Sequence, residues 1–157
     1  MILFALNLVL ALFWAMATGE VTLLTIGTGF LVGMLVLHLV GPVLGDSRYA
    51  IRFLRAINLA LFFLRELIVS SVRVAIDVLR PTFTMRPAII QVPLDVRDDV
   101  QITLLANLIS LTPGTLTVDV SEDKANLYVH AMYGEDPEQV VRRVKEKFER
   151  RIQEVFR

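Results

Sequence analysis

The sequence contains no cysteine and only two histidines. The absence of cysteine excludes disulfide bonds, thiolate nucleophiles and cysteine-ligated zinc or iron–sulfur sites. Two isolated histidines are too few for the usual histidine-built metal site. We therefore expect no metal ion and no cofactor.

Positive charge is missing from the first third of the chain, which has no lysine or arginine before Arg48. From residue 81 onward, by contrast, there are ten basic and twelve acidic residues, so the net charge of zero conceals two unlike halves. Basic and acidic residues are interspersed there, which argues against a nucleic-acid-binding face. With 55% hydrophobic residues overall, the pattern predicts a membrane region over residues 1–81 followed by a soluble domain over 82–157.

Three apolar segments, at about residues 2–18, 21–44 and 51–80, are predicted to be helices of the membrane region. The first two are each near the roughly 20 residues that span a bilayer core. The turn between them is so short that they should be antiparallel neighbours. Gly29 and Gly33, spaced as GxxxG, would let another helix approach closely.

The third segment carries charges on one stripe of a helix of period 3.6. The stripe contains Arg55, Glu66, Ser70, Arg73, Asp77 and Arg80. Two interpretations are open for Arg65, Glu66, Arg73 and Asp77. In the first, they form an ion or proton relay. In the second, they have a structural and docking role, and Arg73 and Asp77 are an i,i+4 pair.

Arg48, Arg52 and Arg55 form the first basic cluster of the chain. By the positive-inside rule this cluster belongs in the cytoplasm, and we expect the C-terminal domain there too. The number of complete membrane crossings stays open. Either the third segment crosses, or it lies along the membrane against other subunits, or one of the first two segments is only a short or tilted insertion.

The soluble region reads as strand, helix, strand, strand, helix, a small α+β domain (order β-α-β-β-α). Asp98 and Asp136 are predicted helix starts, and residues 115–120 and 126–132 a β-hairpin. The predicted inner face of the hairpin is formed by Leu116, Val118, Val120, Leu127, Val129 and Ala131.

Two features of the soluble region are candidate sites. The turn of Thr112, Pro113, Gly114 and Thr115 exposes backbone N–H groups that could bind an anion, but a simple turn into a strand explains it as well. His130, with Asp119 across the hairpin, has no triad around it. The sequence therefore predicts no enzyme and no catalytic residue.

Two segments resemble a known family. They are LANLISLTPGTLTVDVSEDKANLYVHAM, residues 105–132, which holds the turn at 112–115 and His130, and FLRELIVSSVRVAIDVLRP, residues 63–81. Both are similar to the E subunits of the Mrp-type (Mnh or Pha) multisubunit cation/proton antiporters, and the likeness runs nearly end to end. Tyr133 departs from the family, which often has an acid there.

The resemblance implies an accessory, structural or assembly subunit of a Na⁺/H⁺ antiporter that supports cation efflux and pH homeostasis. It implies a multi-pass protein of the bacterial plasma membrane, with a cytoplasmic C-terminal domain. The partners that it implies are membrane lipid and the A, B, C, D, F and G subunits of the antiporter. It assigns no catalytic, cofactor-binding or metal-binding residue. The alternative is a stand-alone membrane-tethered sensor or binding domain.

Overall fold

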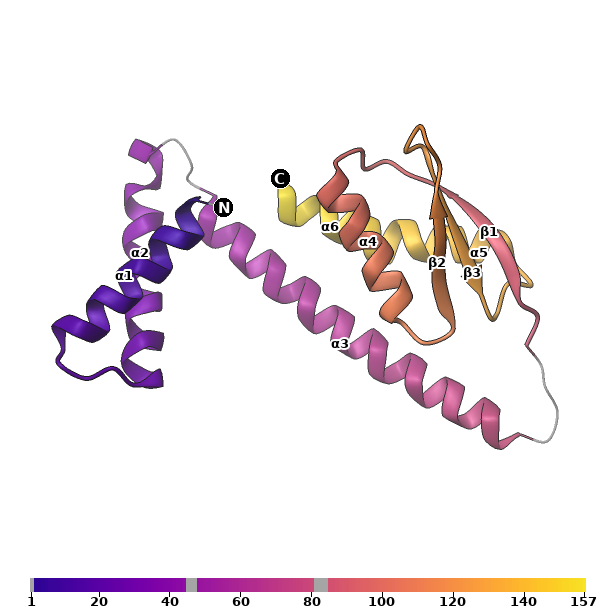
Figure 1. Ribbon diagram of the computed structural model, residues 1–157, viewed down its shortest axis with the longest axis horizontal. Coiled ribbons are helices and arrows are strands. Elements are labelled where there is room, and N and C mark those ends of the chain that lie inside the picture. Colours follow the sequence, from indigo (N-terminus) through magenta and orange to yellow (C-terminus); the bar gives the residue numbers. More distant parts are fainter. Residues whose placement is uncertain (1, 45–47, 81–84) are drawn as a thin grey trace. The chain divides into compact units, whose positions relative to one another are not determined.

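The structure, a computed structural model, describes residues 2–44, 48–80 and 85–157 (Figure 1). It divides into two compact units, Met1–Leu54 and Arg55–Arg157, called here the hairpin unit and the C-terminal unit. This division does not coincide with the predicted boundary at 81/82, because most of the third helix packs with the α+β domain. Pro81, predicted to end that helix, lies outside the described residues, as do residues 82–84.

The hairpin unit contains α1 (Ile2–Ala17) and α2 (Leu23–Leu44), close to the predicted ranges. Pro42 lies inside α2, so Gly41-Pro42 does not interrupt the helix. Among the described residues one helix segment, Leu23–Pro42, is long and apolar enough to cross a bilayer; α1 is apolar but shorter.

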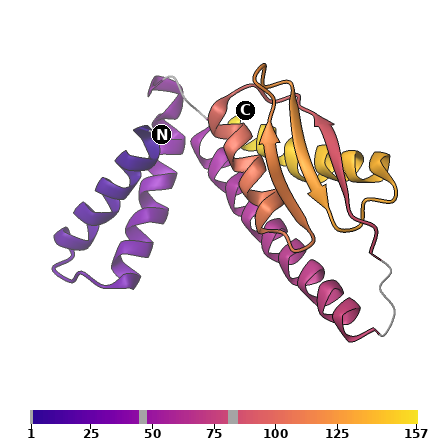
Figure 2. The same cartoon turned by 45° about the vertical axis from the view of Figure 1, so that its right-hand side comes forward.

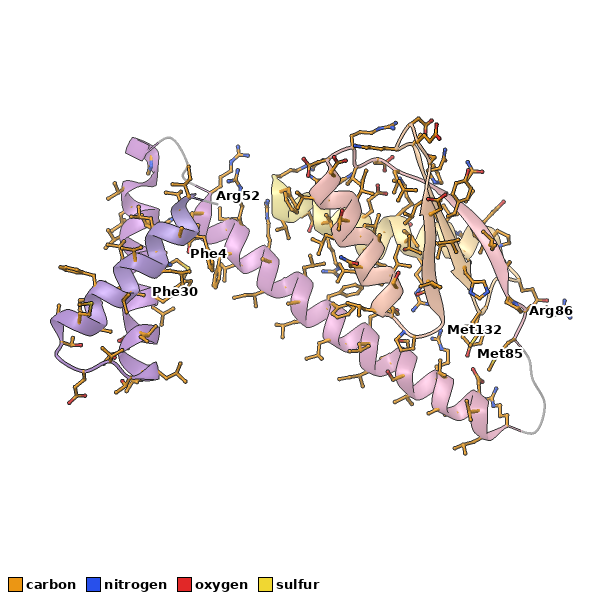
Figure 3. The ribbon with its side chains drawn as sticks, in the orientation of Figure 1. Phe4, Phe30, Arg52, Met85, Arg86 and Met132 are labelled. Carbon is orange, nitrogen blue, oxygen red and sulfur yellow. The ribbon has the colours of Figure 1, made fainter. Side chains whose placement is uncertain are left out.

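Close approach of α1 and α2 depends on the two glycines of the GxxxG motif. A Cβ on Gly29 would lie 2.8 Å from the carbonyl oxygen of Ala11, and one on Gly33 would lie 2.2 Å from Oδ1 of Asn7. Gly29 therefore faces a later residue of α1 than Gly33 does, which makes the helices antiparallel, as predicted. Phe4 and Phe30 pack edge to face across the hairpin, with ring centroids 6.3 Å apart (Figure 3).

Asn7 is fully buried in the hairpin unit. Its Nδ2 donates to the hydroxyl of Tyr49, 2.9 Å away, where the third helix begins. This polar contact ties α1 to the start of α3.

The C-terminal unit holds most of α3 and an α+β domain. Its elements are α3 (Tyr49–Leu79), β1 (Ala88–Pro93), α4 (Asp99–Leu111), β2 (Thr115–Val120), β3 (Asn126–Ala131), α5 (Pro137–Arg143), the π-helix η1 (Val144–Glu149) and α6 (Arg150–Phe156). The predicted order β-α-β-β-α does not match at its end, where α5, η1 and α6 replace one helix. Asp98 and Asp136 cap α4 and α5, as predicted.

The three strands form an antiparallel sheet in the order β1-β3-β2. One face of the sheet is covered by α4 and by the segment from α5 to α6, and α3 packs on the helical layer (Figures 1 and 2). The core joins Val92, Leu105, Val129 and Ile152, all fully buried, with Leu59 of α3. The third helix thus belongs to the same core as the sheet.

The prediction for the inner face was right for β3 and wrong for most of β2. Leu127, Val129 and Ala131 are buried, whereas Leu116 and Val118 are more than half exposed. The register of β2 against β3 shifts between Thr117 and Asp119, which interrupts the strict alternation of inward and outward side chains. Leu116 and Val118 therefore do not share a face with Val120.

Threonine takes the place of the expected apolar residues on the inner side of β2. The hydroxyl of Thr117 donates to the carbonyl of Ala106 (3.1 Å), and that of Thr115 donates to the carbonyl of Ile109 (2.8 Å). These bonds attach the strand to α4.

Candidate functional site

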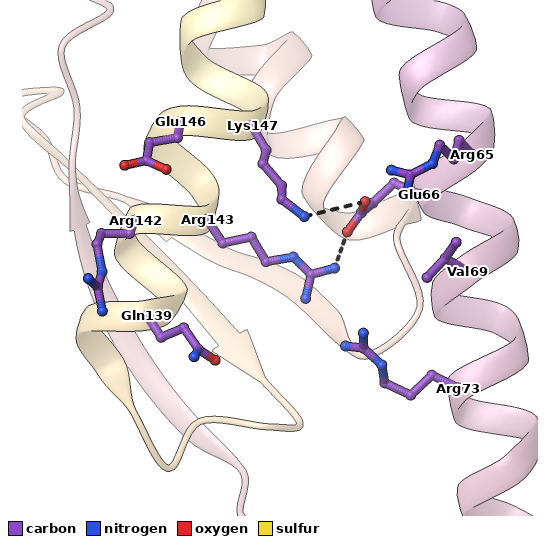
Figure 4. A pocket seen from close by; sticks show the side chains of 9 residues that line it. All are labelled: Arg65, Glu66, Val69, Arg73, Gln139, Arg142, Arg143, Glu146 and Lys147. Carbon is purple, nitrogen blue, oxygen red and sulfur yellow. Dashed lines mark hydrogen bonds and ion pairs between the residues drawn. The ribbon is translucent and has the colours of Figure 1, made fainter.

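The charged stripe of α3 meets the α+β domain of its own chain. Glu66 is 3% exposed, and its Oε1 accepts a hydrogen bond from Nη2 of Arg143. Nζ of Lys147 lies 3.8 Å from the other carboxylate oxygen (Figure 4). Burying a carboxylate is costly unless it is paired, and here two cations of α5 and η1 compensate it.

Asp77 is the second buried acid of α3, at 8% exposure. It accepts a hydrogen bond from the hydroxyl of Tyr133 and lies 3.5 Å from Arg80. This hydrogen bond, together with burial, raises the pKa of Tyr133 above its ordinary value of 10.0. Tyr133, the residue at which the sequence departs from the family that it resembles, therefore donates the hydrogen bond to Asp77.

The start of α3 within the C-terminal unit is held by contacts with α6. Nη1 of Arg55 donates to the carbonyl of Glu154 (2.7 Å). Arg151 lies over the ring of Phe62, 4.3 Å from its centroid, and Phe62 packs edge to face on Phe148. Contacts thus follow the stripe from Arg55 to Asp77.

The structure does not bring all the predicted site residues together. Glu66 and Asp77 are buried and paired, but the ion-pair partner of Asp77 is Arg80, just after α3, and not Arg73 as predicted. Arg65 and Arg73 are exposed and line a cleft beside Glu66. The four charges do not form one chain of hydrogen bonds within the described residues.

The opposite face of α3 is apolar, and no residue that the structure describes covers it. Its exposed residues in the C-terminal unit, called here the apolar face, are Leu61, Leu64, Ile68, Val72, Ile76 and Leu79. Spacings of three and four residues place them on one side of the helix. α3 therefore has one face for its own domain and one left for lipid or another protein.

The turn at 112–115 has a structural explanation. Gly114 has φ +89°, which favours glycine, and the hydroxyl of Thr112 donates to the carbonyl of Leu108 (2.8 Å). The N–H of Thr115 donates to the carbonyl of Thr112. Since the hydroxyls and this N–H group are engaged locally, the turn acts as the connection from α4 to β2.

His130 lies on the open face of the sheet, as its alternation predicted. Its neighbours in register are Ile89 on β1 and Leu116 on β2, while Asp119 is opposite Tyr128. The acid considered as a partner for His130 is thus paired in register with a different residue of β3, two positions before His130. Among the described residues no group of three or more potential metal-ligating side chains lies together.

Sequence reasoning missed Glu149, a carboxylate only 1% exposed. Its Oε1 accepts from the N–H groups of Asp95 (2.6 Å) and Val96 (3.0 Å), and Lys145 lies 2.7 Å from its Oε2. The i,i+4 spacing of Lys145 and Glu149 was the available signal. Their burial could not be read from that spacing.

The sequence matches the model of the Na⁺/H⁺ ion antiporter subunit family, MNHE, over residues 7–155. The chain belongs to this family. It is 37% identical over 152 residues to the E subunit of the Na⁺/H⁺ antiporter of Bacillus subtilis (strain 168), covering 97% of this chain and 96% of that protein. It is also 37% identical over 150 residues to the corresponding antiporter subunit of Alkalihalophilus pseudofirmus, covering 96% and 95%.

Two solved structures are similar. A chain of the Mrp complex from Dietzia sp. DQ12-45-1b has 28% identity and a TM-score of 0.52, covering 66% of this chain and 97% of that one. A chain of an archaeal membrane-bound sulfane sulfur reductase has a TM-score of 0.58 and covers 98% of both, but at 22% identity it shows only a shared fold.

These findings confirm the family and the class of function. A non-enzymatic subunit of a multisubunit cation/proton antiporter, associated with a membrane, is what the family model and the relatives support. The Mrp complex also supports partnership with other subunits of such an assembly.

Proposed function

We propose that this MNHE family member is an accessory subunit whose charged helix α3 has a structural and assembly role in the antiporter. The observation that carries this proposal is the pairing of Glu66 with Arg143 and Lys147 of the same chain. A carboxylate on an ion path faces water or exchanging partners, whereas both oxygens of this buried one are engaged by cations of the same chain.

The apolar face of α3 supports the assembly role. Because the charged side holds the α+β domain, the exposed leucine, isoleucine and valine side chains remain for contact with lipid or with neighbouring subunits. The A, B, C, D, F and G subunits are proposed as partners on the strength of the family. A rigid α3 would transmit the position of the soluble domain to them.

The membrane topology is proposed from charge. Arg48, Arg52 and Arg55 follow the apolar helix α2, so the positive-inside rule places the α+β domain in the cytoplasm of a bacterial cell. In this arrangement the α1–α2 hairpin enters the plasma membrane from the cytoplasmic side and makes the chain multi-pass.

The structural role is tested in cells that express the whole antiporter with a tag on this chain. Glu66→Ala leaves Arg143 and Lys147 without their carboxylate, and we expect a loss of about 3 kcal/mol in docking of α3. The amount of intact complex, measured by native electrophoresis of solubilised membranes, should then fall. The rate of Na⁺-dependent proton movement in everted vesicles should fall in parallel. Glu135→Ala, which breaks an exposed pair with Arg86, is the matched control.

A charge swap separates the two interpretations. Glu66→Arg combined with Arg143→Glu restores an ion pair at the same place but moves the carboxylate off α3. A structural role predicts recovery of both assembly and transport. Intact complexes without transport, in the single variant and in the swap, would show instead that Glu66 belongs to the ion path.

A further inference from the structure

A basic cleft of about 590 Å³ lies between α3 and the segment α5–η1 (Figure 4). We call it the basic cleft, because five cations line it: Arg65, Arg73, Arg142, Arg143 and Lys147. The lining contains two carboxylates, so the positive charges outnumber the negative ones by three. Such an excess between two helices favours an anion.

Only some cations of this cleft have a partner within the chain. Arg143 and Lys147 form ion pairs with Glu66. Arg65, Arg73 and Arg142 are exposed and make no hydrogen bond or ion pair with any residue that the structure describes. Glu146, the other acid of the lining, is exposed and offsets one of these charges. Two arginines remain in excess, with planar donor groups suited to phosphate oxygens.

The cleft borders on apolar surface. Val69, which lies between the two arginines of α3 in sequence, is part of its lining and is 42% exposed. Ile68 and Val72 of the apolar face adjoin it along the helix. An amphipathic helix with arginine beside exposed aliphatic side chains is typical of a helix lying at the surface of a membrane.

We propose that the basic cleft binds the phosphate group of an anionic membrane lipid, whose acyl chains lie along the apolar face of α3. Arg65 and Arg73 hold the phosphate from α3, and Arg142 adds positive charge at the α5 edge of the cleft. The apolar surface beside the cleft favours a lipid over free phosphate, because free phosphate would gain nothing from Val69 and Ile68. The site shares the apolar face of α3 with the assembly role proposed above, but Arg65, Arg73 and Arg142 take no part in the pairing of Glu66.

The test uses the purified full-length chain in a zwitterionic detergent. Thermal unfolding is followed by circular dichroism while dioctanoyl phosphatidylglycerol, dioctanoyl phosphatidylcholine or inorganic phosphate is added at constant ionic strength. We expect a saturable rise of the unfolding midpoint with phosphatidylglycerol, since a ligand of the native state stabilises it. Phosphatidylcholine should have no such effect, and free phosphate should require a higher concentration.

Arg65→Gln with Arg73→Gln should weaken the apparent affinity for phosphatidylglycerol about 25-fold, at about fivefold for each arginine. Arg142→Gln alone should weaken it about fivefold from the opposite helix, which keeps the test decisive if the double variant unfolds. Arg86→Gln with Arg150→Gln removes the same charge elsewhere and should leave the affinity unchanged.

Three outcomes would overturn the proposal. Equal stabilisation by phosphatidylcholine would show that charge is not recognised. Saturation by inorganic phosphate at the same concentration would assign the cleft to a free anion. If the cleft variants bind lipid normally but detach the chain from the antiporter complex, the cleft receives an acidic segment of a neighbouring subunit and not a lipid.

Discussion

Three carboxylates are buried in the described part of the C-terminal unit, and each has a defined partner. Glu66 is held by Arg143, Asp77 by Tyr133, and Glu149 by Lys145 and two backbone N–H groups. Buried ion pairs add little net stability over apolar packing, but the loss of one partner is costly. These residues therefore specify how α3 and the C-terminal helices lie on the sheet more than they stabilise the fold.

Lys145 makes the stability of the domain sensitive to alkali. Burial lowers its pKa, but hydrogen bonds to Asp95 and Glu149 outweigh that effect and raise the pKa above 10.5. Because the folded pKa is the higher one, the stabilisation is complete below about pH 10.5 and is lost as the pH rises through the folded value. Tyr133, whose pKa is also raised, acts in the same direction from about pH 10.0.

We predict that Lys145→Gln lowers the free energy of unfolding by about 2 kcal/mol at neutral pH, because buried Glu149 loses its cation and keeps only its two backbone N–H donors. The variant should also lose part of the decline in stability that the native chain shows above about pH 10.5. Urea titrations of the full-length chain in detergent, monitored by circular dichroism, measure both effects. Lys124→Gln, at an exposed pair with Asp99, is the control. An unchanged alkaline decline would refute the prediction.

Two helices approach each other closely in the hairpin unit because α2 has glycine where α1 crosses it. The GxxxG motif was predicted to accept another helix, and that helix is α1 of the same chain. Ala11 packs against the first of its two glycines and Asn7 against the second.

Gly29→Ala should therefore destabilise the hairpin. The new Cβ would lie 2.8 Å from the backbone oxygen of Ala11 and 2.8 Å from Cβ of Trp14, so the helices must move apart, at a cost of about 1–3 kcal/mol. Gly27→Ala is the matched control, since nothing lies within 4 Å of its added Cβ. Thermal midpoints of the two variants in detergent should differ by several degrees, and equal midpoints would contradict the packing described.

The whole molecule combines an apolar hairpin with an α+β domain that includes α3. A chain without cysteine is well suited to mapping which side of the membrane each part occupies. Single cysteines can be introduced without competing thiols.

We predict that Arg150→Cys reacts with a membrane-impermeant maleimide in everted vesicles and not in intact cells, because the domain is proposed to be cytoplasmic. Glu20→Cys, at the turn between α1 and α2, should react from the outside if the hairpin crosses the membrane twice. Both residues are exposed, so accessibility within the chain does not limit labelling. Labelling of Arg150→Cys in intact cells would invert the proposed topology.

Short-range interactions in the sequence determined most of the elements. Apolar runs, the caps Asp98 and Asp136, and the hairpin turn predicted helices and strands that lie within a few residues of the observed ones. The motif at 112–115 and the α3 segment sufficed to indicate the family. Such signals work because caps, turns and periodicity depend on residues only a few positions apart.

Tertiary packing decided what no local pattern contains. Glu66 meets Arg143, 77 residues away, and Asp77 meets Tyr133, 56 residues away. The stripe on α3 was equally compatible with a neighbouring subunit until the fold placed the chain's own cations against it. The register shift in β2 likewise exposed Leu116 and Val118, because attachment of two threonines to α4 outweighed simple alternation. The charges of α3 were visible in the sequence, but only the packing of distant segments could determine their partners.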